Sequence, residues 1–135
     1  MKKIFIDTDI ILDLLTGRVP FYIHAAMLFS KIDTNEYKAC TSSVIVSNLF
    51  YILRKELGSK EAKKIIGKLL TVITILPVNE KVIRRSLQSD FADLKDAIQY
   101  YTAIEENISI LITRNTKDFK PAKISILTAE EFLSG

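Results

Sequence analysis

The sequence predicts a single α/β domain with three layers, in which helices cover both faces of a five-stranded parallel sheet. Short runs of β-branched and other apolar residues alternate along the chain with longer segments of helical periodicity. This alternation is typical of parallel sheets whose strands are joined by crossover helices. The length of 135 residues suits one domain. We find no repeat, low-complexity tract or linker, so residues 1–135 are interpreted as one domain.

Five elements are expected in the first half of the chain. They are a buried strand at 3–6, helices at 8–16 and about 20–33, a strand at 37–41 and a helix that ends before Gly58. Gly17 ends the first of these helices, and Pro20 suits the first turn of the second. The third helix is capped by Ser42 or Ser43 and carries an apolar stripe with helical spacing.

The second half of the chain continues the alternation with four helices and three strands. They are a helix around 62–69, a strand at 72–76, helices at about 79–88 and 93–107, strands at 109–112 and 124–127, and a terminal helix. Asn79 and Thr128 are the expected N-caps of two of these helices. Lys60, Lys64 and Lys68 form a row that could contact phosphates, although a solvated helix face is the simpler interpretation.

Composition and charge favour a soluble, cytoplasmic protein. The one cysteine, Cys40, excludes an intramolecular disulfide and fits a reducing compartment. Asp7, Asp9 and Asp13 interrupt the apolar start of the chain, which argues against a signal peptide, and no apolar stretch is long enough to span a bilayer. The formal charge of +3 is compatible with a polyanionic partner but does not require one.

Three acidic residues form the candidate functional site. Asp7 follows the first strand, Asp96 lies in the helix before the fourth strand, and Asp118 lies in the loop after the fourth strand. Ligands of such sheets bind beyond the carboxyl ends of the strands, where we expect the three carboxylates to converge. Converging carboxylates repel one another unless a cation binds, and oxygen ligands without His or Cys favour Mg²⁺ or Mn²⁺.

Each of these acids also has a purely structural interpretation. Asp7 could stabilise the positive N-terminus of the following helix, and Asp118 could be a turn residue. Asp93 could be an N-cap, with Asp96 three residues later completing a capping box. These interpretations do not predict that the acids share one edge of the sheet, and their shared position favours a cation site.

Four segments of the sequence carry a resemblance to a known family. They are IFIDTDIILDLL at 4–15, SSVIVSNLFYILRK at 42–55, DFADLKDAIQYYTAIEENISILITRNTKDF at 90–119 and ISILTAEEFL at 124–133. In this order they resemble the PIN-domain family, and in particular its small single-domain toxins of the VapC type. The resemblance covers almost the whole chain. It implies a parallel sheet with strand order 3-2-1-4-5 and a ribonuclease that needs Mg²⁺ or Mn²⁺.

The resemblance also implies roles for individual residues. Asp7 and Asp96 stand where members of the family bind the metal ion. Asn115 and Asp118 stand in the loop that completes the metal site, after Thr113, which would orient a water molecule or a carboxylate.

The sequence departs from the family at Asn48, where members commonly have a glutamate. An amide offers one neutral oxygen in place of a carboxylate, and losing a unit charge about 4 Å from a cation forgoes roughly 4 kcal/mol at an effective dielectric of about 20. Asp9, where members often have asparagine, could compensate, or it could simply occupy the first helical turn. A PIN module that binds RNA or a partner protein without efficient cleavage is therefore the alternative function.

Further expectations concern substrate and partners. Arg114 and Lys117 lie in the loop of the site and are expected to contact phosphates of an RNA substrate. The resemblance implies a small antitoxin protein as a partner and a homodimer. A second enzyme class is less well supported: Asp7 and Asp9 superficially resemble the nucleophile motif of haloacid-dehalogenase-type phosphatases, but Ile11 is only a loose match to the Thr or Val that this motif needs.

Overall fold

A computed structural model describes residues 2–135 and contains, over that range, one five-stranded parallel sheet. Its strands are β1 (Lys2–Ile6), β2 (Tyr37–Ser42), β3 (Ile73–Leu76), β4 (Ile110–Ile112) and β5 (Ser125–Leu127). The strand order β3-β2-β1-β4-β5 confirms the order that the resemblance implied.

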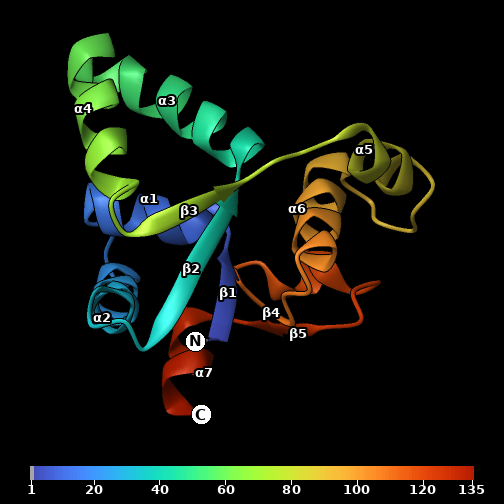
Figure 1. The fold of residues 1–135 in the computed structure, drawn as a ribbon. Helices are drawn as coiled ribbons and strands as arrows, with labels where there is room; N and C mark the ends of the chain where they lie inside the picture. Colours follow the sequence, from blue (N-terminus) through green and yellow to red (C-terminus); the bar gives the residue numbers. More distant parts are fainter. Residues whose placement is uncertain (1) are drawn as a thin grey trace.

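Helices cover both faces of the sheet (Figure 1), which confirms the predicted three-layer arrangement. They are α1 (Thr8–Thr16), α2 (Tyr22–Asp33), α3 (Ser43–Leu57), α4 (Ser59–Leu69), α5 (Glu80–Leu87), α6 (Leu94–Glu105), α7 (Ala129–Ser134) and the 3₁₀ helix η1 (Thr116–Phe119). The paired helices α5 and α6 lie on one face, and α1 to α4 lie on the other, where α7 packs against α2. No helix within residues 2–135 is long and apolar enough to cross a membrane.

Within residues 2–135, side-chain caps mark the N-termini of five helices, and the caps at Ser42, Asn79 and Thr128 are among those that the sequence predicted. Ser42 caps α3 and Asn79 caps α5, each through a hydrogen bond from a backbone N–H to its side chain. Thr128 and Glu131 form a reciprocal capping box at α7. Gly17 ends α1 in the left-handed conformation, with a φ of 63° that favours glycine. Local chemistry therefore determines where these helices start and stop.

Two local features differ from the prediction. Helix α2 begins at Tyr22 and not near Pro20, because residues 19–21 form a turn in which the N–H of Tyr22 donates to the carbonyl of Arg18 (2.6 Å). The short helix η1 follows β4 in a segment expected to be a loop. A single turn of four residues has no periodic pattern from which it could be predicted.

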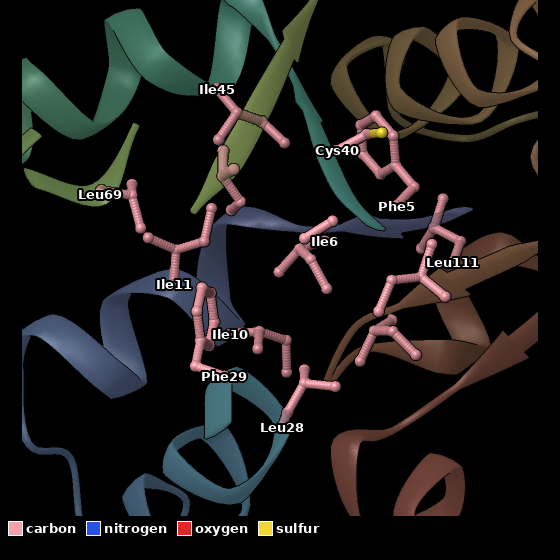
Figure 2. Packing of buried hydrophobic residues seen from close by; sticks show 14 of the residues in the cluster. Phe5, Ile6, Ile10, Ile11, Leu28, Phe29, Cys40, Ile45, Leu69 and Leu111 are labelled. Atoms are coloured by element: carbon pink, nitrogen blue, oxygen red, sulfur yellow. The ribbon is translucent and has the colours of Figure 1, made fainter. Parts of the chain in front are cut away.

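The central strand β1 positions the candidate site. Figure 2 shows Ile6 beside Ile10 of α1, while Phe5 lies next to Cys40 of β2, and all of these side chains are buried. Ile6 pairs with Ile112 of β4, so the chain leaves both strands at the same edge of the sheet. Because β2 lies on the other side of β1, the strand order reverses here, and ligands of α/β sheets bind at such points.

Candidate metal centre

Asp7 lies directly after β1 and is 7% exposed. Its Oδ1 accepts a hydrogen bond from the backbone N–H of Thr8 (2.8 Å), which makes Asp7 the N-cap of α1. Its Oδ2 accepts a hydrogen bond from the hydroxyl of Thr113, the first residue after β4 (2.9 Å). Asp7 therefore has the structural role considered above, and its predicted convergence with the loop after β4 is confirmed.

Asp7 shares a pocket of about 210 Å³ with two further carboxylates. Residues from α1, α3, α6 and the loop after β4 contribute to this acidic pocket. It is lined by Asp7, Asp9, Asp96 and Asn115, together with Thr8, Leu12, Arg18, Ile52 and Lys95. Two members of the predicted trio, Asp7 and Asp96, thus meet at this edge of the sheet, and Asp9 joins them.

Two contacts position Asp96. The carboxylate of Asp93 accepts hydrogen bonds from the N–H groups of Lys95 (2.8 Å) and Asp96 (3.4 Å), so Asp93 is the predicted N-cap. One turn later, the fully buried Gln99 accepts a hydrogen bond from the hydroxyl of Ser42 (2.6 Å). The N-terminal half of α6 is therefore fixed to the end of β2, which places the half-buried Asp96 at the pocket.

Burial and mutual repulsion disfavour the charged forms of these carboxylates. Burial raises the pKa of Asp7 to about 6, and the negative charges of Asp9 and Asp96 add to the shift. Burial also raises the pKa of Asp96 to about 6, with contributions from the charges of Asp93 and Asp118. A cation in the pocket would oppose both shifts, because it stabilises the carboxylate over the carboxylic acid.

Asp9 is held by the loop after β4 and keeps one oxygen unused. Its Oδ2 accepts hydrogen bonds from the hydroxyl of Thr113 (3.3 Å), the N–H of Arg114 (3.0 Å) and the amide of Asn115 (3.3 Å). Its Oδ1 is buried without a hydrogen-bond partner among the described residues. Leaving a buried carboxylate oxygen unpaired is costly, and a nearby cation would offset that cost.

The donor set fits a hard divalent cation. The pocket offers carboxylate and amide oxygens, which are the ligands that suit Mg²⁺ and Mn²⁺. The unpaired Oδ1 of Asp9 is one such donor. Across residues 2–135, no three His, Cys, Asp or Glu side chains are grouped closely enough to hold a metal ion as they stand. A Mg²⁺ ion held by one or two of these carboxylates would complete its coordination with water molecules.

Two predicted ligands lie outside the lining of the acidic pocket. Asp118 belongs to η1, is exposed and lines a separate pocket with Lys117, although its charge raises the pKa of Asp96. Asn48 is half-buried on α3, and Ile52, one turn further on, is the α3 residue that lines the pocket. The metal-binding roles of Asp118 and Asn48 stay predictions.

Asp13 holds the loop after β4 against α1, a role that the sequence did not predict. Its Oδ2 accepts a hydrogen bond from Nε of Arg114 (2.8 Å), and Asp13 is 1% exposed. The spacing of Asp9 and Asp13, four residues apart in an otherwise apolar helix, was a signal for such a role, because it places both acids on one face of α1. The phosphate contacts expected of Arg114 and the exposed Lys117 stay predictions.

Comparison with known proteins extends over most of the chain. Residues 3–117 match the family model of the PIN domain. Ribonuclease VapC1 from Aquifex aeolicus (strain VF5) is 26% identical to this chain, with 97% of this chain and 93% of that protein covered. DNA-bound VapBC from Salmonella typhimurium has the same fold, with a TM-score of 0.73, 17% identity and coverage of 96% and 99%. A toxin–antitoxin complex from Klebsiella pneumoniae gives a TM-score of 0.69, 24% identity and coverage of 93% and 96%. Because the family match covers well over half of the sequence, the chain belongs to the PIN domain family.

Proposed function

We propose that this protein is a divalent-metal-dependent endoribonuclease and the toxin of a toxin–antitoxin pair. The observation that carries the proposal is the convergence of Asp7, Asp9 and Asp96 at the edge of the sheet where the strand order reverses. RNA is the expected substrate, because a relative aligned over nearly the whole chain is a ribonuclease by name. An acidic pocket open to solvent in a PIN domain is the kind of site that metal-assisted hydrolysis of a phosphodiester needs.

The protein would hold Mg²⁺ or Mn²⁺ with oxygen donors. The proposed donors are Asp7, Asp9, Asp96, Asp118 and Asn115, with Asn48 as a weak or outer donor. The bound ion would lower the pKa of a coordinated water molecule and offset the charge of the phosphodiester. The hydroxyl of Thr113 lies 2.9 Å from Asp7 Oδ2 and 3.3 Å from Asp9 Oδ2, so its one proton is shared between the two carboxylates and links their positions.

Basic side chains border the acidic pocket and would contact the phosphates of the substrate. Arg18 and Lys95 line the pocket, and Lys117 is exposed nearby in η1. Such contacts position a strand without reading its sequence. Arg114 can contribute only its terminal nitrogens, because its Nε is paired with Asp13.

The proposed partners follow from the solved relatives. Structures that share this fold include VapBC and a toxin–antitoxin complex. We infer that this chain also binds a small antitoxin protein and forms a homodimer. A short reading frame next to its gene would be the expected source of the antitoxin.

One alternative keeps the fold and removes efficient cleavage. This alternative is a PIN module that binds RNA or a partner protein. It is favoured by Asn48, because members of the family commonly have a glutamate at this position. The phosphatase interpretation of Asp7 and Asp9 loses its support, because the PIN domain match includes both residues.

Cleavage of single-stranded RNA with Mg²⁺ or Mn²⁺ tests the proposal. The wild-type protein should cleave, EDTA should stop cleavage, and the double variant Asp7→Asn/Asp96→Asn should be inactive. Asp33→Asn is the matched control, because Asp33 is exposed at the end of α2, near the start of β2 at the opposite edge of the sheet. Equal cleavage by wild type and double variant would indicate a contaminating nuclease and contradict the proposal.

A further inference from the structure

A second pocket adjoins the acidic pocket on the side of α2 and α7. Its volume is about 210 Å³, and Asn115 lines both pockets. Ile10, Phe21 and Ala129 supply its apolar walls. The proposed cleavage chemistry uses none of these three residues, so the role of this pocket is separate from metal binding.

One wall of this second pocket is a guanidinium stacked on an aromatic ring. Cζ of Arg114 lies 4.1 Å from the centroid of the Phe21 ring. The buried Asp13 accepts the hydrogen bond from Arg114 Nε, which holds the guanidinium and offsets its charge. Phe21 is 42% exposed, so a flat group can reach the stack from solvent. Aromatic rings and guanidinium planes are the surfaces on which nucleobases stack.

The polar groups around the stack match the edge of a base better than a phosphate. Asp13 and Glu130 line the pocket together with Asn115 and His24, and Oδ1 of Asp13 has no hydrogen-bond partner among the described residues. Because Asp13 is paired with Arg114, the carboxylate of Glu130 leaves the lining with a net negative charge, which disfavours a phosphate group. Carboxylate and amide oxygens accept hydrogen bonds from the exocyclic amino groups of bases.

We propose that the second pocket binds one nucleobase of a single-stranded RNA, next to the phosphodiester at the acidic pocket. The inference rests on the proposed action on RNA. Because Asn115 belongs to both pockets, a nucleotide beside the cleaved bond can place its base against the stack of Phe21 and Arg114. The acceptors of the pocket favour adenine, cytosine or guanine, which carry an exocyclic amino group, over uracil.

Fluorescence anisotropy in EDTA tests binding without cleavage. The probes are fluorescein-labelled single-stranded oligouridylates, each with one central adenosine, cytidine or guanosine, beside the strand of uridines alone. The wild-type protein should bind at least one substituted strand more tightly than the uridine strand. Phe21→Leu should weaken this binding roughly five-fold or more, because the loss of one base–aromatic stack costs at least about 1 kcal/mol. The substitution should also remove the preference for the substituted strand. Phe21→Tyr keeps the ring and should retain both.

Tyr22→Leu is the matched control, because Tyr22 is a neighbouring aromatic residue that is 44% exposed and does not line the pocket. Circular dichroism checks that each variant folds. If Phe21→Leu leaves RNA binding and base preference unchanged, the proposal is overturned. This is also the result expected if the pocket binds a partner protein and not RNA. An equal loss in Tyr22→Leu, or a wild-type protein that binds none of the strands, overturns it as well.

Cleavage with Mn²⁺ separates this inference from the proposed nuclease activity. A wild-type protein that cleaves, with a base preference at the cut that Phe21→Leu changes, supports both. Cleavage with the same base preference in Phe21→Leu overturns the base pocket alone. Binding that depends on Phe21 without any cleavage supports the base pocket and contradicts the nuclease.

Discussion

Asp7 serves the fold and the proposed chemistry with the same carboxylate. Its two oxygens accept hydrogen bonds from Thr8 and Thr113, which fixes the start of α1 against the loop after β4. The same position buries the carboxylate near two other acids, so that its charged form is disfavoured. A carboxylate that is costly to ionise in the metal-free protein gives a testable dependence of stability on pH.

In metal-free buffer, Asp7→Asn should stabilise the fold at about pH 7 and not at about pH 4. The pKa of Asp7 rises from 3.8 to about 6 on folding. As pH increases through this window, the unfolded chain loses the proton first, so the wild-type protein loses stability. Above pH 6 this shift lowers the free energy of unfolding by about 3 kcal/mol. This value is the largest gain in stability that Asp7→Asn could give. Urea unfolding in EDTA measures the difference.

The pH comparison has its own control. Asp33→Asn alters an exposed acid and should change stability by less than about 0.5 kcal/mol at either pH. A loss of stability in Asp7→Asn at pH 7 would show that the hydrogen bonds of the carboxylate outweigh its burial.

Asp9→Asn tests whether Asp9 compensates for Asn48. The carboxylate of Asp9 has an unpaired buried oxygen and lines the acidic pocket, whereas Asn48 does not line it. We expect the substitution to weaken Mn²⁺ binding about ten-fold or more, the effect of about 1.4 kcal/mol. The increase of Tm with Mn²⁺ concentration measures the affinity. An unchanged response to Mn²⁺ would rule out compensation by Asp9.

At the scale of elements, α1 and the loop after β4 form one unit. Asp9 accepts a hydrogen bond from the backbone N–H of Arg114, and Asp13 accepts one from Nε in the side chain of Arg114. Both acids lie on the same face of α1, so the helix holds the loop at two points one turn apart. The ion pair therefore positions Asn115 and Thr113 at the acidic pocket.

Asp13→Asn should destabilise the protein by about 1 kcal/mol in urea unfolding, because burial, which raises the pKa of Asp13, offsets part of the gain from its ion pair with Arg114. The substitution leaves the charge of Arg114, whose side chain is 26% exposed, without its buried partner. The loss should be smaller than that for a fully buried pair because solvent reaches Arg114. The double variant Asp13→Leu/Arg114→Leu removes both charges and should recover much of the loss. A double variant less stable than Asp13→Asn would contradict this account.

The sequence predicts elements better than contacts between them. The bounds of α1 agree with the prediction because the signals are local: Asp7 caps the helix and Gly17 ends it. The start of α2 and the helix η1 depend on turns whose hydrogen bonds have no sequence period. The pair of Asp13 and Arg114 joins residues 101 positions apart, so the spacing of Asp9 and Asp13 could mark the acidic face of α1 but could not identify its partner.

At the scale of the whole molecule, the topology brings the acids together. Alternating strands and helices predict the layers, but the strand order came from the family resemblance and not from periodicity. Once β1 lies between β2 and β4, Asp7 and Thr113 must leave the sheet at one edge. The sequence could therefore place Asp7 and Asp96 at the site, whereas the side-chain position of Asp118 depends on how η1 folds.

The family resemblance also predicts a homodimer. Light scattering after gel filtration should give a mass of about twice the 15.3 kDa of one chain. A mass of one chain over the accessible concentrations would contradict this expectation while leaving the site unaffected.

The central claim is that the acidic pocket binds a divalent cation, and calorimetric titration with Mn²⁺ tests it most directly. The account predicts saturable binding to the wild-type protein and to Asp33→Asn, and its loss in Asp7→Asn/Asp96→Asn. Wild-type protein that takes up no Mn²⁺, or a double variant that binds it as tightly, would contradict the claim.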